Sequence, residues 1–307
     1  MKSFHWLLVG LLAFGVAVGL VGYGIIFKIV RRGYSAAPPV SMLPTIEETA
    51  SVSSLLLSTS TPTTTVTPTP TPGVVLPPIT PGERAAHVPV LLYHYVSENP
   101  NKDDTKRDGL STSPTIFKEQ LKTMKRSGYT TVTFDELAAY FDGKSSLPSK
   151  PVILTFDDGY IDFYLNAYPI LSGEGMKGVV FIPSGLIGGG AYMSWSQVEE
   201  IARSPYVVVA AHSIHHYMLT KSNENVLKNE LNESKRVLEQ HVGYPVNWMA
   251  YPYGAFDERV VAAAKAAGYV GAATTMPGVY QYKSRLYHIS RLRAGKRSGQ
   301  ALLQLIE

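Results

Sequence analysis

The sequence predicts an α/β fold built around a parallel β-sheet over residues 87–307. Short apolar segments of strand length alternate there with longer amphipathic or polar segments. Regular alternation of this kind is typical of a parallel sheet, either open or closed into a barrel. In both forms the chemistry gathers at the carboxyl ends of the strands, so polar residues that directly follow the apolar segments are the candidate site.

The expected strands are short apolar runs with turn residues around them. In chain order they are residues 88–93, 129–134, 151–156, 177–182, 206–211, 248–252, 269–274 and 286–292. Helix signals lie between them. Pro114 starts a helix that Gly128 ends, and Ser194 can cap the segment WSQVEEIA. The polar segment 223–240 repeats apolar side chains at helical spacing.

Residues 1–34 are expected to form a membrane anchor with its flanks. Residues 6–27 carry no charge, and a helix of that length covers about 33 Å, close to the thickness of the hydrocarbon layer. A cleaved signal peptide and a buried core helix are the alternatives, but the apolar region of a signal peptide is usually only about 7–15 residues long. Lys28, Arg31 and Arg32 follow the span. Read literally, the positive-inside rule would keep the rest of the chain in the cytoplasm, although long domains often translocate regardless of charge.

Residues 35–86 are expected to form an extended, disordered linker. They are rich in Thr, Ser and Pro, with few charges, and include the stretch STSTPTTTVTPTPTPG. Such a composition cannot bury a core and is typical of stalks outside cells. An anchor followed by a stalk predicts a single-pass protein of the cell membrane whose folded domain lies outside the cytoplasm. A generic linker, which would carry no information on sidedness, is the alternative.

The composition excludes several classes of function. The chain has 307 residues, no cysteine and a formal net charge of +4. Disulfides and thiolate metal ligands are therefore impossible. The net positive charge is much smaller than is typical of nucleic-acid-binding proteins, so no nucleic-acid partner is expected. No sequence signal indicates an obligate protein partner.

Polar residues at two predicted strand ends indicate a metal site. Asp157 and Asp158 follow the third predicted strand, and His212 and His216 follow the fifth. Two histidines four residues apart can meet on one turn, and one carboxylate completes a set that leaves positions open for water, as in catalytic sites. An isolated DDG is more often a turn, and an isolated histidine pair is more often on the surface, but the combination favours a site. Asp158 is the expected ligand, Asp157 the expected base, and the neighbouring His215 a bystander.

These residues resemble the motifs of the polysaccharide deacetylase family, whose members share the NodB homology domain. TFDDG at 155–159, HSIHH at 212–216 and YPYG at 251–254 are similar to its three motifs. The resemblance implies a distorted, TIM-barrel-like (β/α) barrel over residues 87–307. It also implies a hydrolase that removes N-acetyl groups from an N-acetylglucosamine polymer, either exopolysaccharide or cell wall, with a divalent metal, most commonly zinc.

The resemblance assigns a role to each motif residue. Asp157 is the general base, and Tyr253 offers a backbone N–H to the oxyanion. The implied metal ligands are Asp158, His212 and His216. LLYHYV at 91–96 makes His94 the general acid, as in the circularly permuted branch that acts on poly-β-1,6-N-acetylglucosamine. His288 is the competing acid, although its position inside a strand pattern favours a buried or edge histidine.

Two features of the family are missing from the sequence. No arginine occurs in residues 245–250, and no Asp-x-x-Asp-Trp motif follows YPYG. Arg291 is a candidate to orient the base instead; alternatively, it is an ordinary surface residue of a strand.

Three aromatic residues are candidates for binding sugar. Tyr253, Trp195 and Tyr160 can stack on sugar rings, although such residues more often pack in the core.

Other functions remain open at this stage. One alternative is a carbohydrate-binding or scaffold barrel without turnover, and another is a hydrolase of the same fold that acts on small amides, because a fold does not determine its substrate. Within the favoured class, peptidoglycan is an alternative substrate to a β-1,6-linked polymer. The presence of base, ligands and acid favours an enzyme, and the expected anchor and stalk favour a polymeric substrate.

Overall fold

The computed structural model describes residues 76–307. The expected anchor, residues 1–34, and most of the expected linker lie outside the described residues. Within the described part, no helix combines the length and apolar character needed to cross a bilayer. The last residues of the expected linker range contact the folded domain, because Glu83 accepts hydrogen bonds from the backbone N–H and the hydroxyl of Ser284, both at 2.6 Å.

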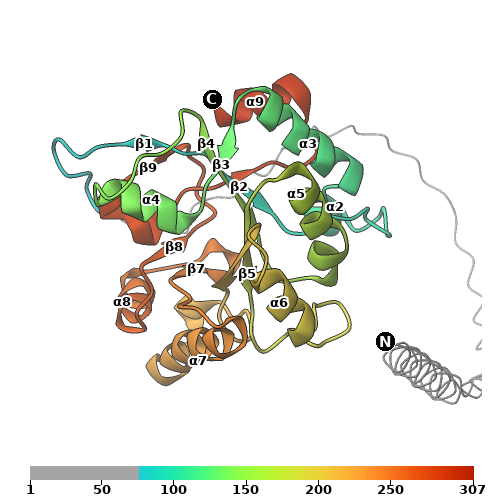
Figure 1. Cartoon of the computed structure of the whole chain (residues 1–307). Coiled ribbons are helices and arrows are strands. Elements are labelled where there is room, and N and C mark those ends of the chain that lie inside the picture. Colours follow the sequence, from blue (N-terminus) through green and yellow to red (C-terminus); the bar gives the residue numbers. More distant parts are fainter. Residues whose placement is uncertain (1–75) are drawn as a thin grey trace, which may run out of the picture. The chain divides into compact units, whose positions relative to one another are not determined.

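A curled parallel sheet forms the centre of the fold (Figure 1). Its strands lie in the order β10, β2, β4, β5, β6, β7, β8, and β3 pairs with β4 outside this path. The bounds are β2 (Val90–Tyr93), β3 (Thr130–Thr131), β4 (Pro151–Phe156), β5 (Gly178–Ile182), β6 (Val207–Ala211), β7 (Trp248–Ala250), β8 (Gly271–Ala273) and β10 (Leu292–Arg293). A separate antiparallel pair consists of β1 (Ala86–His87) and β9 (Tyr280–Gln281).

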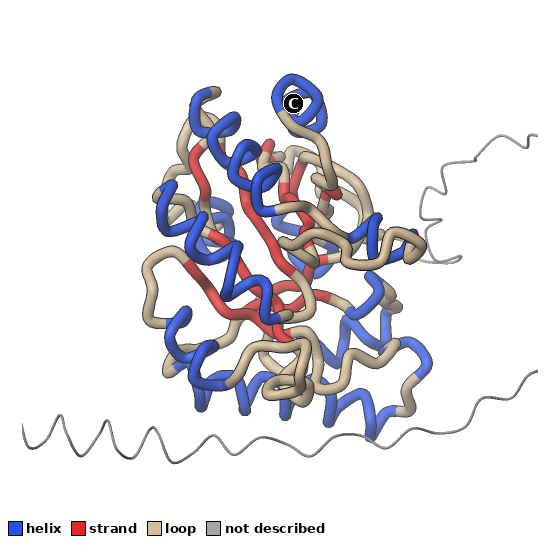
Figure 2. The backbone as a smooth tube through the Cα atoms, turned by 90° about the vertical axis from the view of Figure 1, so that its right-hand side faces the viewer, coloured by secondary structure: helices blue, strands red, loops and turns tan. Residues whose placement is uncertain are grey.

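Helices surround the strands on the outside (Figure 2). They are α2 (Thr105–Leu110), α3 (Pro114–Arg126), α4 (Phe134–Phe141), η1 (Phe163–Ala167), α5 (Tyr168–Glu174), α6 (Trp195–Ala202), η2 (Leu219–Lys221), α7 (Glu224–Val242), η3 (Pro252–Gly254), α8 (Glu258–Ala266), η4 (Lys283–His288) and α9 (Gly299–Ile306). Their starts follow local chemistry. Ser194 accepts the N–H of Gln197 in a capping box at α6, and the Asn223 side chain caps α7.

The chain from Ile289 to Arg293 connects the two edges of the sheet. Ile289 forms a parallel bridge with Ala273 of β8, and Leu292 pairs with Leu91 of β2. The sheet therefore curls back on itself. The prediction of a parallel α/β fold of the barrel type is confirmed in the form of a curled parallel half-barrel with helices outside it.

Two strand predictions are wrong in extent. Residues 286–292 form the end of η4 and the short β10, because the apolar pattern there reflects the packing of Leu286 and Ile289 into the core rather than a strand register. The predicted strand 129–134 shortens to β3. Thr133 caps α4 in a capping box, so Phe134 begins a helix instead of ending a strand.

The central strands are buried on both faces, as expected of a parallel sheet covered by helices. Val152, Leu154 and Phe156 of β4 belong to the larger cluster beneath the outer helices. Ile153 belongs to a smaller cluster that also contains Phe134 and Leu137 of α4. This second cluster fills the interior of the curled sheet.

The close approach of β8 to its neighbours predicts a strong effect of Gly271→Ala on stability. An added Cβ would lie 2.3 Å from Cζ3 of Trp248 and 2.5 Å from the carbonyl oxygen of Leu286. We expect this overpacking to lower the free energy of unfolding by about 1–3 kcal/mol. Thermal melting measures this loss of stability. Gly173→Ala in α5, where the added Cβ would meet no atom within 4 Å beyond its chain neighbours and the backbone of its own helix, is the control and should stabilise by roughly 0.5–1 kcal/mol. Equal melting temperatures for the two variants would contradict this account of the packing.

Candidate active site

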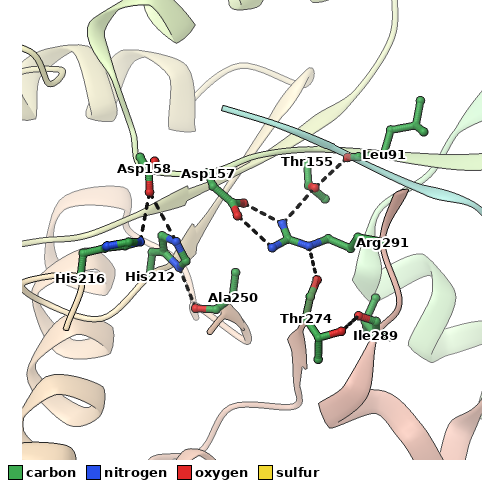
Figure 3. A network of polar contacts seen from close by, with 10 residues as sticks. All are labelled: Leu91, Thr155, Asp157, Asp158, His212, His216, Ala250, Thr274, Ile289 and Arg291. Atoms are coloured by element: carbon green, nitrogen blue, oxygen red, sulfur yellow. Dashed lines mark hydrogen bonds and ion pairs between the residues drawn. The ribbon is translucent and has the colours of Figure 1, made fainter. Parts of the chain in front are cut away.

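The carboxyl ends of β4 and β6 bring the predicted site residues together. Asp157 and Asp158 follow β4 directly, and His212 follows β6. Asp158 has a positive φ of 75°, a backbone conformation that non-glycine residues rarely adopt. The two neighbouring carboxylates point to different partners: Asp157 toward Arg291, and Asp158 toward the two histidines (Figure 3).

Asp158, His212 and His216 form a cluster that could hold a metal ion. One possible ligand atom from each lies within 4.8 Å of the others. Asp158 Oδ1 is 3.5 Å from His212 Nε2 and 3.3 Å from His216 Nε2. The structure therefore brings together the three residues that the sequence proposes as ligands.

The chemistry of these donor atoms fits a divalent cation. His212 Nδ1 lies 2.7 Å from the carbonyl oxygen of Ala250, which can only accept, so Nδ1 carries the proton and Nε2 presents a lone pair. Burial lowers the pKa of His212 to about 3 and also lowers that of His216, so both rings are neutral at pH 7. Two neutral imidazoles and one carboxylate are a donor set that suits zinc among other ions.

The Asp158 carboxyl lies in an environment that disfavours its charge. Burial, followed by the negative charge of Asp157, raises the pKa of Asp158 to about 7. A bound cation would offset both effects, because it supplies the opposite charge at short range.

Arg291 holds Asp157 in a bidentate ion pair. Its Nη1 donates to Asp157 Oδ1 at 2.7 Å and its Nη2 to Oδ2 at 2.8 Å (Figure 3). The guanidinium side chain is 0% exposed, and two of its remaining N–H groups reach the carbonyl oxygen of Thr274 and the hydroxyl of Thr155. Burial alone would raise the pKa of Asp157, but the charge of Arg291, supported by His212, outweighs it and holds this pKa below its ordinary value. Arg291 is therefore the orienting residue and not a surface strand residue.

His94 lies beside the acidic pair. The backbone N–H of Asp157 donates to the carbonyl oxygen of Tyr93 at 3.0 Å, which places the residue after Tyr93 next to the DDG turn. Burial lowers the pKa of His94 to about 4, and the negative charge of Asp157 acts against this shift. His288 lies in η4 with its ring 5.1 Å from that of Phe256. Burial lowers the pKa of His288 to about 4, and the charges of Lys265 and Arg285 add to this shift.

Two of the three predicted sugar-binding residues border the metal cluster. The Tyr253 ring centroid lies 4.6 Å from that of His216, and 62% of Tyr253 is exposed. Tyr253 also has a positive φ of 61°. Tyr160, two residues after Asp158, stacks on Tyr95 with 4.1 Å between ring centroids.

Trp195 has a different environment. Its ring stacks on His241 at 3.8 Å, in the contact between α6 and α7, and within residues 76–307 no aromatic contact joins it to the metal cluster. Its role in binding sugar stays a prediction.

The fold and the site together define a curled parallel α/β half-barrel with an Asp-His-His cluster at its strand ends. Residues 144–272 match the family model for polysaccharide deacetylase. The part of the chain that carries the motifs therefore matches the family that those motifs predict, and a relative named as a polysaccharide deacetylase supports a deacetylase hydrolase.

Known proteins resemble the chain over most of the described part. YxkH of Bacillus subtilis (strain 168), itself assigned to the polysaccharide deacetylases, is 29% identical over 226 residues, which is 73% of this chain and 78% of YxkH. The poly-beta-1,6-N-acetyl-D-glucosamine N-deacetylase of Staphylococcus aureus (strain MRSA252) is 26% identical over 171 residues, covering 52% of this chain and 59% of that enzyme. The structure of the Streptococcus pyogenes deacetylase PplD in complex with acetate superposes with a TM-score of 0.68 at 28% identity, covering 73% of this chain and 100% of that one.

The raised pKa of Asp158 predicts a pH-dependent metal affinity. The cation binds the ionised carboxylate, so a proton competes with it below the pKa of about 7. We expect the affinity of the full chain for Zn²⁺ to fall as the pH is lowered through about 7 and to level off above it. Titration of the metal-free protein against a competing chelator measures this. A pH-independent affinity over that interval, or equal affinity in Asp158→Asn, would contradict the assignment.

Proposed function

We propose that this chain removes N-acetyl groups from an N-acetylglucosamine-containing polysaccharide, of exopolysaccharide or cell wall, and releases acetate. One observation carries the proposal: the Arg291-held carboxylate of Asp157 lies next to a cluster that can bind a cation. The family supports deacetylation, and the name of the Staphylococcus aureus relative favours poly-β-1,6-N-acetylglucosamine as the first polymer to test.

Asp157 is the proposed general base. Arg291 keeps this carboxylate ionised and holds its orientation, so it can take a proton from the attacking water. The proposed ligands of a divalent ion, which we take to be zinc, are Asp158, His212 and His216. When bound there, the ion supplies Lewis acidity that activates water and polarises the acetamide carbonyl.

His94 and Tyr253 complete the proposed machinery. His94 is neutral at pH 7, so the proton that it donates is the one that Asp157 has taken from the attacking water and passed on. With a pKa of about 4, protonated His94 is a strong acid and can protonate the leaving nitrogen. Tyr253 is the proposed oxyanion donor through its backbone N–H, and its exposed ring beside His216 can stack on sugar. Tyr160 and Trp195 are proposed as further sugar contacts.

We also propose that residues 6–27 anchor the chain in the cell membrane and that the catalytic domain lies outside the cytoplasm. The support is the uncharged segment of membrane-spanning length and the Thr/Ser/Pro-rich stretch that follows it. A tethered enzyme can act repeatedly on an insoluble polymer. The product would carry free amines, which would make the polymer cationic.

Acetate release from polymers tests the proposed function. We expect the zinc-loaded full chain to release acetate from poly-β-1,6-N-acetylglucosamine, and chitin oligomers and peptidoglycan are assayed in parallel. Asp157→Asn and His94→Ala should each lower kcat/KM by about 100-fold or more, because each removes one partner in proton transfer.

Matched changes far from the site serve as controls for these two variants. Asp142→Asn changes an exposed carboxylate that pairs with lysines, and His87→Ala changes a histidine beside the chain terminus. Both should keep wild-type activity. No acetate from any polymer, with zinc bound in full, would contradict the proposal and favour a binding module or a small-amide hydrolase.

Arg291→Lys tests how the base is held. Lysine cannot form the bidentate pair, so Asp157 loses orientation and its pKa rises. Activity that needs the ionised carboxylate is present above its pKa and lost below it, so the acid limb of the pH–rate profile should move to higher pH. We expect kcat/KM to fall by about 100-fold from misplacement of the base. Zn²⁺ is kept saturating at every pH so that protonation of Asp158 does not set the limb, and under that condition an unmoved acid limb would argue against Asp157 as the base.

A further inference from the structure

The loop after β6 carries two of the three candidate metal ligands, His212 and His216, and its backbone is unfavourable at two positions. Ser213 and His216 have positive φ values of 62° and 58°, in the left-handed region. Non-glycine residues keep such conformations only where surrounding contacts impose them. The contacts that impose this one therefore bear on the direction of both imidazoles.

The carboxylate of Glu230 makes several of these contacts. It lies on α7, is 2% exposed, and its Oε2 accepts the backbone N–H groups of Ile214 and His215, both at 2.9 Å. Its Oε1 is 2.6 Å from Nδ1 of His215. One turn further along α7, the Ser234 hydroxyl donates to the carbonyl oxygen of Ser213 at 2.8 Å. Hydrogen bonds to a buried carboxylate are charge-assisted and stronger than neutral ones.

The segment after β5 contacts the same loop. The N–H of Gly185 donates to the carbonyl oxygen of Ile214 at 2.9 Å, and the N–H of Ser184 donates to that of Ser213 at 3.1 Å. A Cβ added at Gly185 would lie 2.6 Å from Cγ2 of Ile214, which shows how closely the two segments approach. The loop is thus bonded both to α7 and to the turn after β5.

His216 depends on this arrangement more than the other ligands do. The His212 ring is fixed by its own bond to the carbonyl oxygen of Ala250. His216 follows His215 directly, its side chain is 22% exposed, and its backbone N–H donates to the hydroxyl of Ser213. Its direction is therefore set by the backbone of residues 213–215.

We propose that Glu230 is a positioning residue for the metal site: it holds the loop in the conformation that aims His216 at Asp158 and His212. Among residues 76–307 the hydrogen bonds of the Glu230 carboxylate go to Ile214 and His215, so it acts on the cluster through the loop backbone and His215. The inference rests on the proposed metal site, but not on the identity of the polymer.

Metal affinity of Glu230→Gln tests this role. Glutamine keeps the size of the side chain but removes its negative charge, so the bonds from the N–H groups of Ile214 and His215 lose their charge assistance, and the new NH₂ group opposes Nδ1 of His215 whenever that nitrogen carries its proton. We expect the metal-free full chain to bind Zn²⁺ about 10–100-fold more weakly, as for other partners that orient metal ligands. Competition with a chelator measures the affinity without an activity assay.

Glu239→Gln is the matched control. Glu239 lies on the same helix and also accepts a backbone N–H, that of Val246 at 3.0 Å, together with Lys235 Nζ at 2.8 Å. The same chemical change there should lower the melting temperature of the metal-free protein less than Glu230→Gln does, because the Glu239 side chain is 34% exposed, and should leave Zn²⁺ affinity within about 2-fold of wild type.

A Zn²⁺ affinity of Glu230→Gln within about 2-fold of wild type, or an equal loss in Glu239→Gln, would overturn the proposal. If Glu230→Gln does not fold, Ser234→Ala removes one bond to the same loop, and we expect a several-fold loss of affinity. No loss in Ser234→Ala would then overturn it. Wild-type protein that binds Zn²⁺ through His216 but releases no acetate would refute the proposed function and leave this inference standing.

Discussion

The buried ion pair between Arg291 and Asp157 is the interaction on which the rest of the site depends. Removing a guanidinium from water is unfavourable unless its nitrogens donate to acceptors in the protein. Here the Asp157 carboxylate, the Thr274 carbonyl oxygen and the Thr155 hydroxyl are those acceptors. Arg291 lies in the segment that bonds to both edges of the sheet. The closure of the sheet and the orientation of the base are therefore one structural feature.

This pair also explains how two adjacent carboxylates differ in character. Arg291 holds the pKa of Asp157 below its ordinary value, whereas burial and the charge of Asp157 raise that of Asp158 to about 7. The positive φ of Asp158 directs its side chain away from the ion pair and toward His212 and His216. One residue is thereby suited to accept a proton, and the other to share a cation with two neutral imidazoles.

Several residues around the site have backbone conformations that are unfavourable for non-glycine residues. Asp158, Ser213, His216 and Tyr253 are the non-glycine residues with positive φ in the described part of the chain, and all four lie at or beside the metal cluster. Such conformations persist where neighbouring contacts over-determine them. Glu230 provides such contacts for the histidine loop, and its carboxylate is buried on a helix face between Leu227 and Leu231.

The sequence by itself predicted the parallel α/β class, most strand positions, helix starts such as the Ser194 cap, and the position of Asp157, Asp158, His212, His216 and His94 at or just beyond strand ends. These follow from local patterns: apolar runs, capping residues and polar residues at strand ends. Tertiary structure alone decided the short β10, the extent of β3, the place of Trp195 between two helices, and the partners of Arg291 and Glu230. Arg291 and Asp157 are 134 residues apart in the chain. No local pattern encodes such a contact, because it exists only after the sheet has curled and brought its two edges to the same segment.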